Sequence, residues 1–142
     1  MQTVKDILDA KGREFWSVGP DATVYDAIKL MADEGIGSVL VLENAELKGI
    51  FTERDFARKV ALEHASSLQT QVHAVMSPAV LYAKPEQTLE ECMALMTERR
   101  VRHLPVLVDH EVQGVISIGD LVKSVIAEQQ FIIEQLENYI TG

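Results

Sequence analysis

The stretch Gly49-Ile50-Phe51-Thr52-Glu53-Arg54-Asp55 recurs 65 residues later as Gly114-Val115-Ile116-Ser117-Ile118-Gly119-Asp120. Both copies contain a glycine, two apolar residues, a hydroxyl residue, two variable residues and an aspartate. The hydroxyl-to-aspartate spacing is that of a capping box, which begins a helix. A glycine at the start of an apolar strand marks a bulge or a close approach of backbone. Each copy therefore predicts a strand that leads directly into a helix.

The repetition extends well beyond this motif. Residues 16–60 align with residues 81–125 without a gap, and ten of the 45 aligned pairs are identical. At average residue frequencies, chance would give about three. A solenoid needs three or more units to bury its faces. The two copies are therefore expected to form two subdomains that pack against each other.

Each copy predicts the same order of elements. A short strand (16–18 or 81–83) precedes a helix that Thr23 or Thr88 caps. A hairpin follows, with strands 38–42 and 48–51 in the first copy and 103–108 and 112–116 in the second. A second helix begins at Thr52 or Ser117. The predicted fold class is α/β, with two tandem β-α-β-β-α subdomains packed with pseudo-twofold symmetry.

A short helical segment precedes each copy, with apolar residues Val4, Ile7 and Leu8 in the first and Val72, Val75 and Met76 in the second. The first copy carries three extra residues near 11–15. We divide the chain into a first subdomain with its lead helix (1–68), a second subdomain (69–127) and a C-terminal helical extension (128–142).

The extension continues a helical pattern of apolar residues beyond the repeat: Ile126, Ile132, Ile133, Leu136, Tyr139 and Ile140. This apolar face has no intramolecular cover in the predicted fold. We expect a homodimer whose contact includes this helix. The alternative is a helix that folds back over the lead helix at Val4–Leu8.

Composition limits the classes of function. The chain has 142 residues, of which 47% are hydrophobic and 25% charged, and its net charge is −9. This acidity argues against nucleic acids and anionic membranes as partners. The single Cys92 excludes an internal disulfide and a cysteine zinc cluster, and we interpret it as a small buried hydrophobe. Without a recognisable signal peptide or spanning apolar run, the expected location is cytoplasmic.

The motif residues suit a nucleoside ligand. A carboxylate on a first helical turn can accept both hydroxyls of a ribose, and the free amides at a helix start suit a phosphate. Capping alone remains the alternative for a single copy, whereas the duplication and the paired glycines favour a ligand site. We identify no catalytic residue and no metal ligands. Trp16, at the start of a strand, is interpreted as a core residue.

At this level of detail, the sequence closely resembles a CBS-domain pair, also called a Bateman module, over Val4 to about Val125. The stretch Thr52–Lys59 and the Tyr139–Gly142 ending look like those of small stand-alone CBS-pair proteins. The resemblance implies that each cleft binds an adenosyl ligand and is completed by the opposite repeat. It also implies that the motif aspartate holds the ribose and that apolar strand residues enclose the adenine.

The resemblance implies two ligand sites. The first is expected to contain Ile50, Thr52, Arg54 and Asp55, with Val80, Tyr82, Arg102, His103 and Pro105 from the second repeat. The second is expected to contain Val115, Ser117 and Asp120, with Ser17, Val18, Gly37 and Ser38 from the first repeat.

The two sites should differ in their affinity for phosphate. Arg102 and His103 favour phosphate recognition in the first site, because an arginine fork matches phosphate. Gly37 and Ser38 at the equivalent positions carry no charge, so the second site should hold phosphate less tightly. Arg58 and Lys59 could reach a phosphate or lie at the surface, and both interpretations stay open.

The predicted function is a regulator that binds AMP, ATP or NAD(H), with S-adenosylmethionine less expected, and that acts on a separate partner protein. No catalytic cofactor is expected. One alternative is a small nucleotide- or NAD-using enzyme with its active site in the cleft. A purely structural interaction module is a third class.

Overall fold

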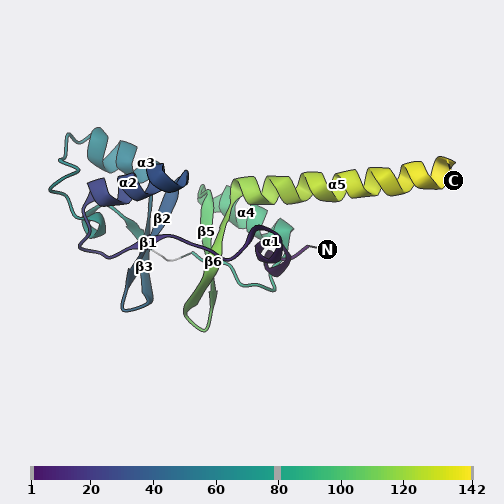
Figure 1. Cartoon of the computed structure of the whole chain (residues 1–142), viewed down its shortest axis with the longest axis horizontal. Coiled ribbons are helices and arrows are strands. Elements are labelled where there is room, and N and C mark those ends of the chain that lie inside the picture. The colour runs from purple at the N-terminus through teal and green to yellow at the C-terminus, as the bar shows by residue number, and fades with distance from the viewer. Residues whose placement is uncertain (1, 79–80, 142) are drawn as a thin grey trace.

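The computed structural model describes residues 2–78 and 81–141. Two α/β units lie side by side, and a long C-terminal helix, α5 (Ile118–Thr141), projects away from them (Figure 1). The first unit contains β1 (Ser17–Val18), α2 (Val24–Glu34), β2 (Ser38–Glu43), β3 (Glu46–Thr52) and α3 (Glu53–Asp55), which continues as the π-helical turn η1 (Phe56–Ala61). The second unit contains α4 (Leu89–Arg99), β5 (His103–Val108), β6 (Glu111–Ser117) and α5. The predicted α/β class is confirmed.

The two hairpins share one register, as the repeat predicts. Both are antiparallel, with Ser38 opposite Thr52 in β2–β3 and His103 opposite Ser117 in β5–β6. Each contains an irregularity at the same point of the repeat, next to Val41 or Val106. The two halves therefore repeat in backbone detail.

Two predicted elements are wrong in the second repeat. Residues 81–83 form no strand, only a single bridge from Ala83 to Val106, so the second sheet holds two strands among the described residues. The lead helix expected near Val72–Met76 shortens to a 3₁₀ turn, η2 (Val72–Ala74). Next, β4 (Ser77–Pro78) pairs with β3 and gives the first sheet the order β1-β2-β3-β4. Pro78 favours this extended chain, because a proline disfavours helix in the residue before it.

The lead segments are exchanged between the repeats. Helix α1 (Val4–Lys11) packs into the second core, where Val4 and Leu8 are fully buried with Leu89. Val72 lies in the first core, and its amide donates to the Ala22 carbonyl at 2.8 Å. Each unit is thus completed by a segment that lies next to the other unit in the sequence.

Each unit has one apolar core beneath its sheet. The first core joins the inward faces of α2 and β2 with Phe51, and the second joins those of α4 and β5 with Ile116. Cys92 is 1% exposed in the second core, and burial raises the pKa of its thiol to about 11. The interpretation of Cys92 as a small buried hydrophobe is confirmed.

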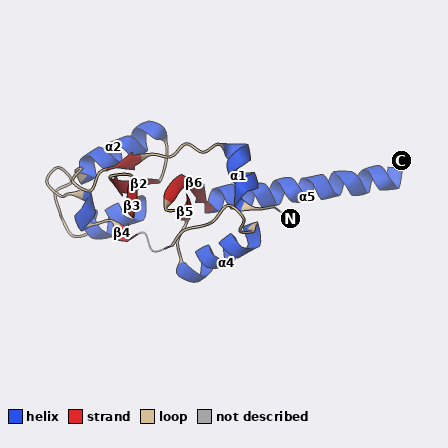
Figure 2. Ribbon diagram, turned by 90° about the horizontal axis from the view of Figure 1, so that it is seen from below, coloured by secondary structure: helices blue, strands red, loops and turns tan. Residues whose placement is uncertain are grey.

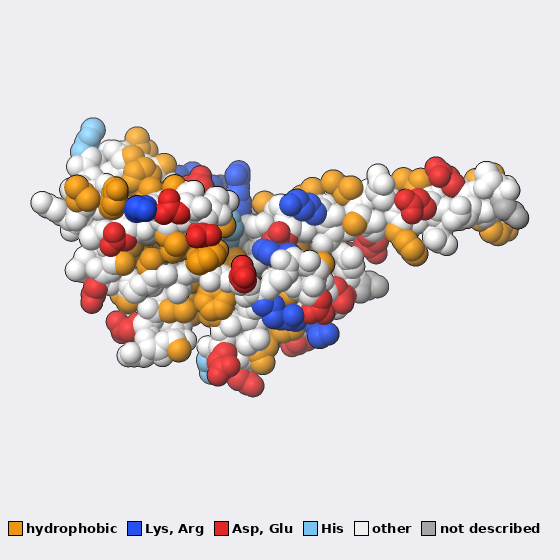
Figure 3. All heavy atoms as spheres, in the orientation of Figure 1, with side chains coloured by type: hydrophobic (Ala, Val, Ile, Leu, Met, Phe, Trp, Pro, Cys, Tyr) orange, Lys and Arg blue, Asp and Glu red, His pale blue; other side chains and the backbone are white. Residues whose placement is uncertain are grey.

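Helix α5 does not fold back over α1. Its first turns lie between α1 and α4 and bury Leu121 (Figure 2). Beyond them the helix is exposed, including every apolar residue of the predicted extension. Figure 3 shows apolar side chains along this free part of the helix.

Candidate functional site

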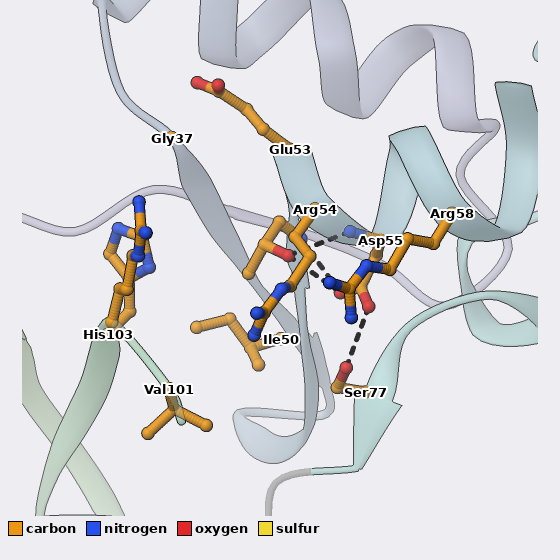
Figure 4. Close-up of a pocket in the computed structure, with 11 residues that line it drawn as sticks. Gly37, Ile50, Glu53, Arg54, Asp55, Arg58, Ser77, Val101 and His103 are labelled. Carbon is orange, nitrogen blue, oxygen red and sulfur yellow. Dashed lines mark hydrogen bonds between the residues drawn. The ribbon is translucent and has the colours of Figure 1, made fainter. Parts of the chain in front are cut away.

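The first cavity, of about 480 Å³, lies where β3 and α3 of the first unit meet the start of β5. It brings together six predicted residues: Ile50, Thr52, Arg54, Asp55, Arg102 and His103. Figure 4 shows several of them around the hollow. Sequence reasoning did not place Gly37, Glu53, Ser77 or Val101 here, and it left Arg58 open.

Asp55 is the buried carboxylate of this cavity, with 5% exposure. One of its oxygens accepts hydrogen bonds from the Thr52 amide and hydroxyl, both at 3.1 Å. The other accepts from the Ser77 hydroxyl at 2.9 Å and lies 3.2 Å from the Lys59 ammonium. The capping box is therefore formed by the first oxygen. The second oxygen contacts only the side chains of Ser77 and Lys59, which a ligand would be able to displace.

The cavity combines three cations with two carboxylates. Arg54, Arg58 and Arg102 line it together with Glu53 and Asp55. Arg54 reaches across the junction and donates to the Arg100 carbonyl at 2.8 Å. An anionic ligand therefore meets a net positive lining, although the whole protein is acidic.

The motif glycine admits the strand that carries Ser77. A Cβ on Gly49 would lie 2.6 Å from the Ser77 carbonyl oxygen and 2.6 Å from the Met76 sulfur. Any larger residue would push β4 away from β3, and with it the hydroxyl that binds Asp55. The predicted close approach of backbone is confirmed at Gly49.

A second cavity, of about 700 Å³, contains the second motif. Five predicted residues line it: Gly37, Ser38, Val115, Ser117 and Asp120. Its opposite wall is the segment from Lys11 to Trp16, which sequence reasoning missed. The three extra residues near 11–15 were the available signal, because an insertion next to a cleft can form its wall.

Asp120 is held by a cation. One carboxylate oxygen accepts from the Lys11 ammonium at 2.6 Å and from the Ser117 amide at 2.8 Å. Burial opposes ionisation of Asp120, but these hydrogen bonds outweigh it and hold the pKa below its ordinary value. The lining also includes Glu14, so this cavity has one cation against two carboxylates.

Several predicted residues lie elsewhere. Tyr82 lines a separate hollow beside Lys84. Pro105 is buried within β5, where its carbonyl accepts from the Ala83 amide. In the second site, Ser17 and Val18 do not line the cavity, since β1 turns Val18 toward the first core. Val80 lies outside the described residues.

The interpretation of Trp16 as a core residue is wrong. Its side chain is 38% exposed and lines the second cavity. Strand β1 begins one residue later, so Trp16 precedes the strand that packs on the core.

His103 and Gly37 line both cavities. Burial lowers the pKa of His103, while the Asp120 and Glu53 carboxylates oppose that shift. The imidazole is therefore neutral at pH 7 and lies between the two clefts. A ligand in either cavity would therefore lie next to His103 and Gly37.

Among the described residues, no group of three His, Cys, Asp or Glu side chains could hold a metal ion. No helix in the described part of the chain is long and apolar enough to span a membrane.

Comparison with known proteins gives consistent matches. The model of the CBS domain family matches residues 4–62 and 72–127. The chain is 36% identical over 150 residues to "CBS domain-containing protein CBSX3, mitochondrial" of Arabidopsis thaliana, covering 99% of this chain and 72% of that protein. A solved structure of a protein with CBS domains from Burkholderia ambifaria MC40-6 is 55% identical, with a TM-score of 0.87 over 90% of this chain and 96% of the other. The hexameric CBS-CP12 protein from bloom-forming cyanobacteria is 27% identical, with a TM-score of 0.77 over 85% of this chain and 70% of the other.

Proposed function

Because the chain belongs to the CBS-domain family, whose paired repeats are generally regulatory ligand-binding modules, we propose that it binds adenine nucleotides reversibly at the two clefts. AMP, ATP and NAD(H) are the proposed ligands. The observation that carries the proposal is the first cavity, where a buried Asp55 lies beside a net positive lining.

The chemistry of the first cavity fits the three parts of such a ligand. Ribose hydroxyls would replace the Ser77 and Lys59 contacts on the exchangeable oxygen of Asp55. Ile50 and Val101 offer apolar surface for the adenine. Arg102 also lines the cavity and would bind the phosphate, because a guanidinium donates to phosphate in a planar fork.

We propose that the second cavity binds the same ligand class but holds phosphate less tightly. Its carboxylates outnumber its one cation, and Lys11 is already paired with Asp120. The aromatic residues Phe15 and Trp16 line it and would favour the nucleoside part of the ligand.

The test is a binding screen on the full chain with AMP, ATP, NADH and adenosine, by thermal shift and calorimetry. A ligand at a hundredfold excess over its dissociation constant should stabilise the fold by about 2.7 kcal/mol. Asp55→Asn should abolish the tighter site and Asp120→Asn the weaker one. Asp33→Asn, an exposed carboxylate paired with Lys29, is the matched control and should change neither. A screen in which none of the four compounds shifts the transition overturns the proposal.

The proposed action is regulatory, through a separate partner protein and as a homodimer. Turnover of ATP or NADH by the purified protein would overturn this assignment in favour of an enzyme. Nucleotides identified by mass spectrometry after purification would name the physiological ligand. The cytoplasmic location stays a prediction, which cell fractionation would test.

A further inference from the structure

The free part of α5 carries a line of residues, here called the seam, at the spacing of a coiled coil. Val122, Ile126, Gln129, Ile133, Leu136 and Ile140 follow one another at alternating intervals of four and three residues. This alternation is the 3.5-residue repeat of a coiled coil, and the exposed Ile132 and Tyr139 widen the apolar stripe along one side of it. At 1.5 Å per residue, the seam is about 27 Å long.

The seam is open along its whole length. Its apolar members are exposed, from 45% at Val122 to 80% at Ile140. Leu121 and Val125 point into the second core, and the seam lies about a quarter of a turn around the helix from them. The seam and the face that packs on the second core are therefore different sides of the helix.

The residue types select the partner. In a heptad frame, Ile126, Ile133 and Ile140 occupy the a positions, and Val122, Gln129 and Leu136 the d positions. In parallel coiled coils, β-branched residues at a with leucine at d favour two strands, and this chain has isoleucine at all three a positions and Leu136 at one d position. We propose that α5 pairs with α5 of a second copy as a parallel two-stranded coiled coil. This inference deepens the proposed homodimer by stating its contact.

Gln129 fixes the orientation. In a parallel pair, each Gln129 lies opposite the partner's Gln129, so the two amides can hydrogen-bond to each other. In an antiparallel pair centred on the same seam, Gln129 would face an isoleucine and lose that partner. An Asn or Lys at an a position specifies register at a cost in stability, and Gln129, at a d position, has the same role in the proposed pair.

Charge does not oppose the pairing. In the heptad frame, Glu128 and Glu134 lie at outer c and b positions, away from the seam. Glu137 lies at an e position, which in a parallel pair faces a g position of the partner, here an isoleucine. The acidic tail therefore brings no like charges together across the seam.

The first experiment measures mass in solution by light scattering on the full chain. Wild type is expected to be a dimer. Ile133→Glu should raise the dissociation constant of the dimer at least 100-fold. Phe131→Glu is the matched control, because Phe131 is similarly exposed (61% against 52%) but lies on the opposite side of the helix, and it should stay dimeric. Circular dichroism and AMP binding would verify that both variants fold.

The second experiment tests orientation by disulfide formation. Gln129→Cys should form a dimer-linking disulfide under mild oxidation, whereas Phe131→Cys should not. The native thiol of Cys92 is buried and does not compete.

The outcomes separate the claims. A monomeric wild type overturns both the coiled coil and the proposed homodimer. A dimer that survives Ile133→Glu overturns the coiled coil alone. A dimer lost in Ile133→Glu but not linked through Gln129→Cys overturns the parallel orientation. Nucleotide binding is measured separately and does not depend on any of these results.

Discussion

The replacement of Gly49 by alanine tests how the motif glycine supports the site. The new Cβ would lie 2.6 Å from the Ser77 carbonyl oxygen and 2.6 Å from the Met76 sulfur. Met76 is flexible and can move, but the carbonyl belongs to the backbone of β4. Relief of the overlap therefore requires β4 to separate from β3, which breaks the pairing of Gly49 with Pro78.

The expected cost follows from this geometry. Overpacking against a fixed neighbour costs about 1–3 kcal/mol, and the lost strand pairing places this case near the upper end. For a domain of this size, about 2–3 kcal/mol corresponds to a fall of roughly 7–10 °C in Tm. Because Ser77 moves with β4, Asp55 also loses a hydrogen bond. Gly49→Ala should therefore change the dissociation constant for AMP as well as the free energy of unfolding.

Gly119→Ala is the matched control. A Cβ there meets only the Ser117 hydroxyl, at an ordinary 3.6 Å, and the residue lies within α5. Since alanine is the better helix former, this variant should gain about 0.5–1 kcal/mol. Urea unfolding of wild type and both variants measures the difference. A Gly49→Ala protein within 0.5 kcal/mol of wild type would refute the claimed contact between β4 and the motif.

Three further predictions concern the charged residues of the clefts. Arg102→Ala should weaken AMP binding about 10- to 100-fold, which is the value of one charge-assisted hydrogen bond, and should change the affinity for adenosine by no more than about twofold. Equal losses of AMP and adenosine affinity in calorimetry would contradict a phosphate contact. Because the pKa of Asp120 lies below its ordinary 3.8, its stabilisation is complete above about pH 4 and is lost as pH falls through the lowered value. Lys11→Met should therefore raise that pKa and move the acid unfolding midpoint to higher pH, and an unchanged midpoint would exclude the ion pair. Burial lowers the pKa of His103 below 6.5, so the contribution of neutral His103 to the free energy of unfolding is present above that pH and declines below it. His103→Gln should therefore flatten the dependence of unfolding free energy on pH between about pH 7 and 5. An identical pH dependence in the variant would count against a buried neutral imidazole.

The duplication made much of the fold predictable. A gap-free repeat of hydrophobic pattern and cap residues placed both hairpins and the helices after Thr23 and Thr88 close to their observed bounds. Local rules decide these elements, because caps, alternation and turns act within a few residues. The motif residues Thr52, Asp55, Ser117 and Asp120 were placed correctly at cavity walls for the same reason.

The predictions that failed concern contacts between residues that are far apart in the sequence. Lys11 reaches Asp120 across 109 residues, and nothing local to either residue indicates that pairing. The exchange of lead segments between the units brings it there, and the same exchange places Ser77 against Asp55. Tyr82 and Pro105, which the resemblance assigned to the first site, do not line the first cavity, because the packing of residues 81–83 and of β5 turns them elsewhere.

The sequence by itself determined that the chain is a doubled α/β unit with the same Gly-to-Asp motif in each half, because repeats, caps and periodicity are local properties. Only the tertiary structure decided which residues face each other in the two clefts. It set three cations against two carboxylates in one and a lysine-bound aspartate in the other. The physical reason is that electrostatic environment depends on distances of a few ångströms between side chains, and those distances arise only when segments far apart in sequence pack together.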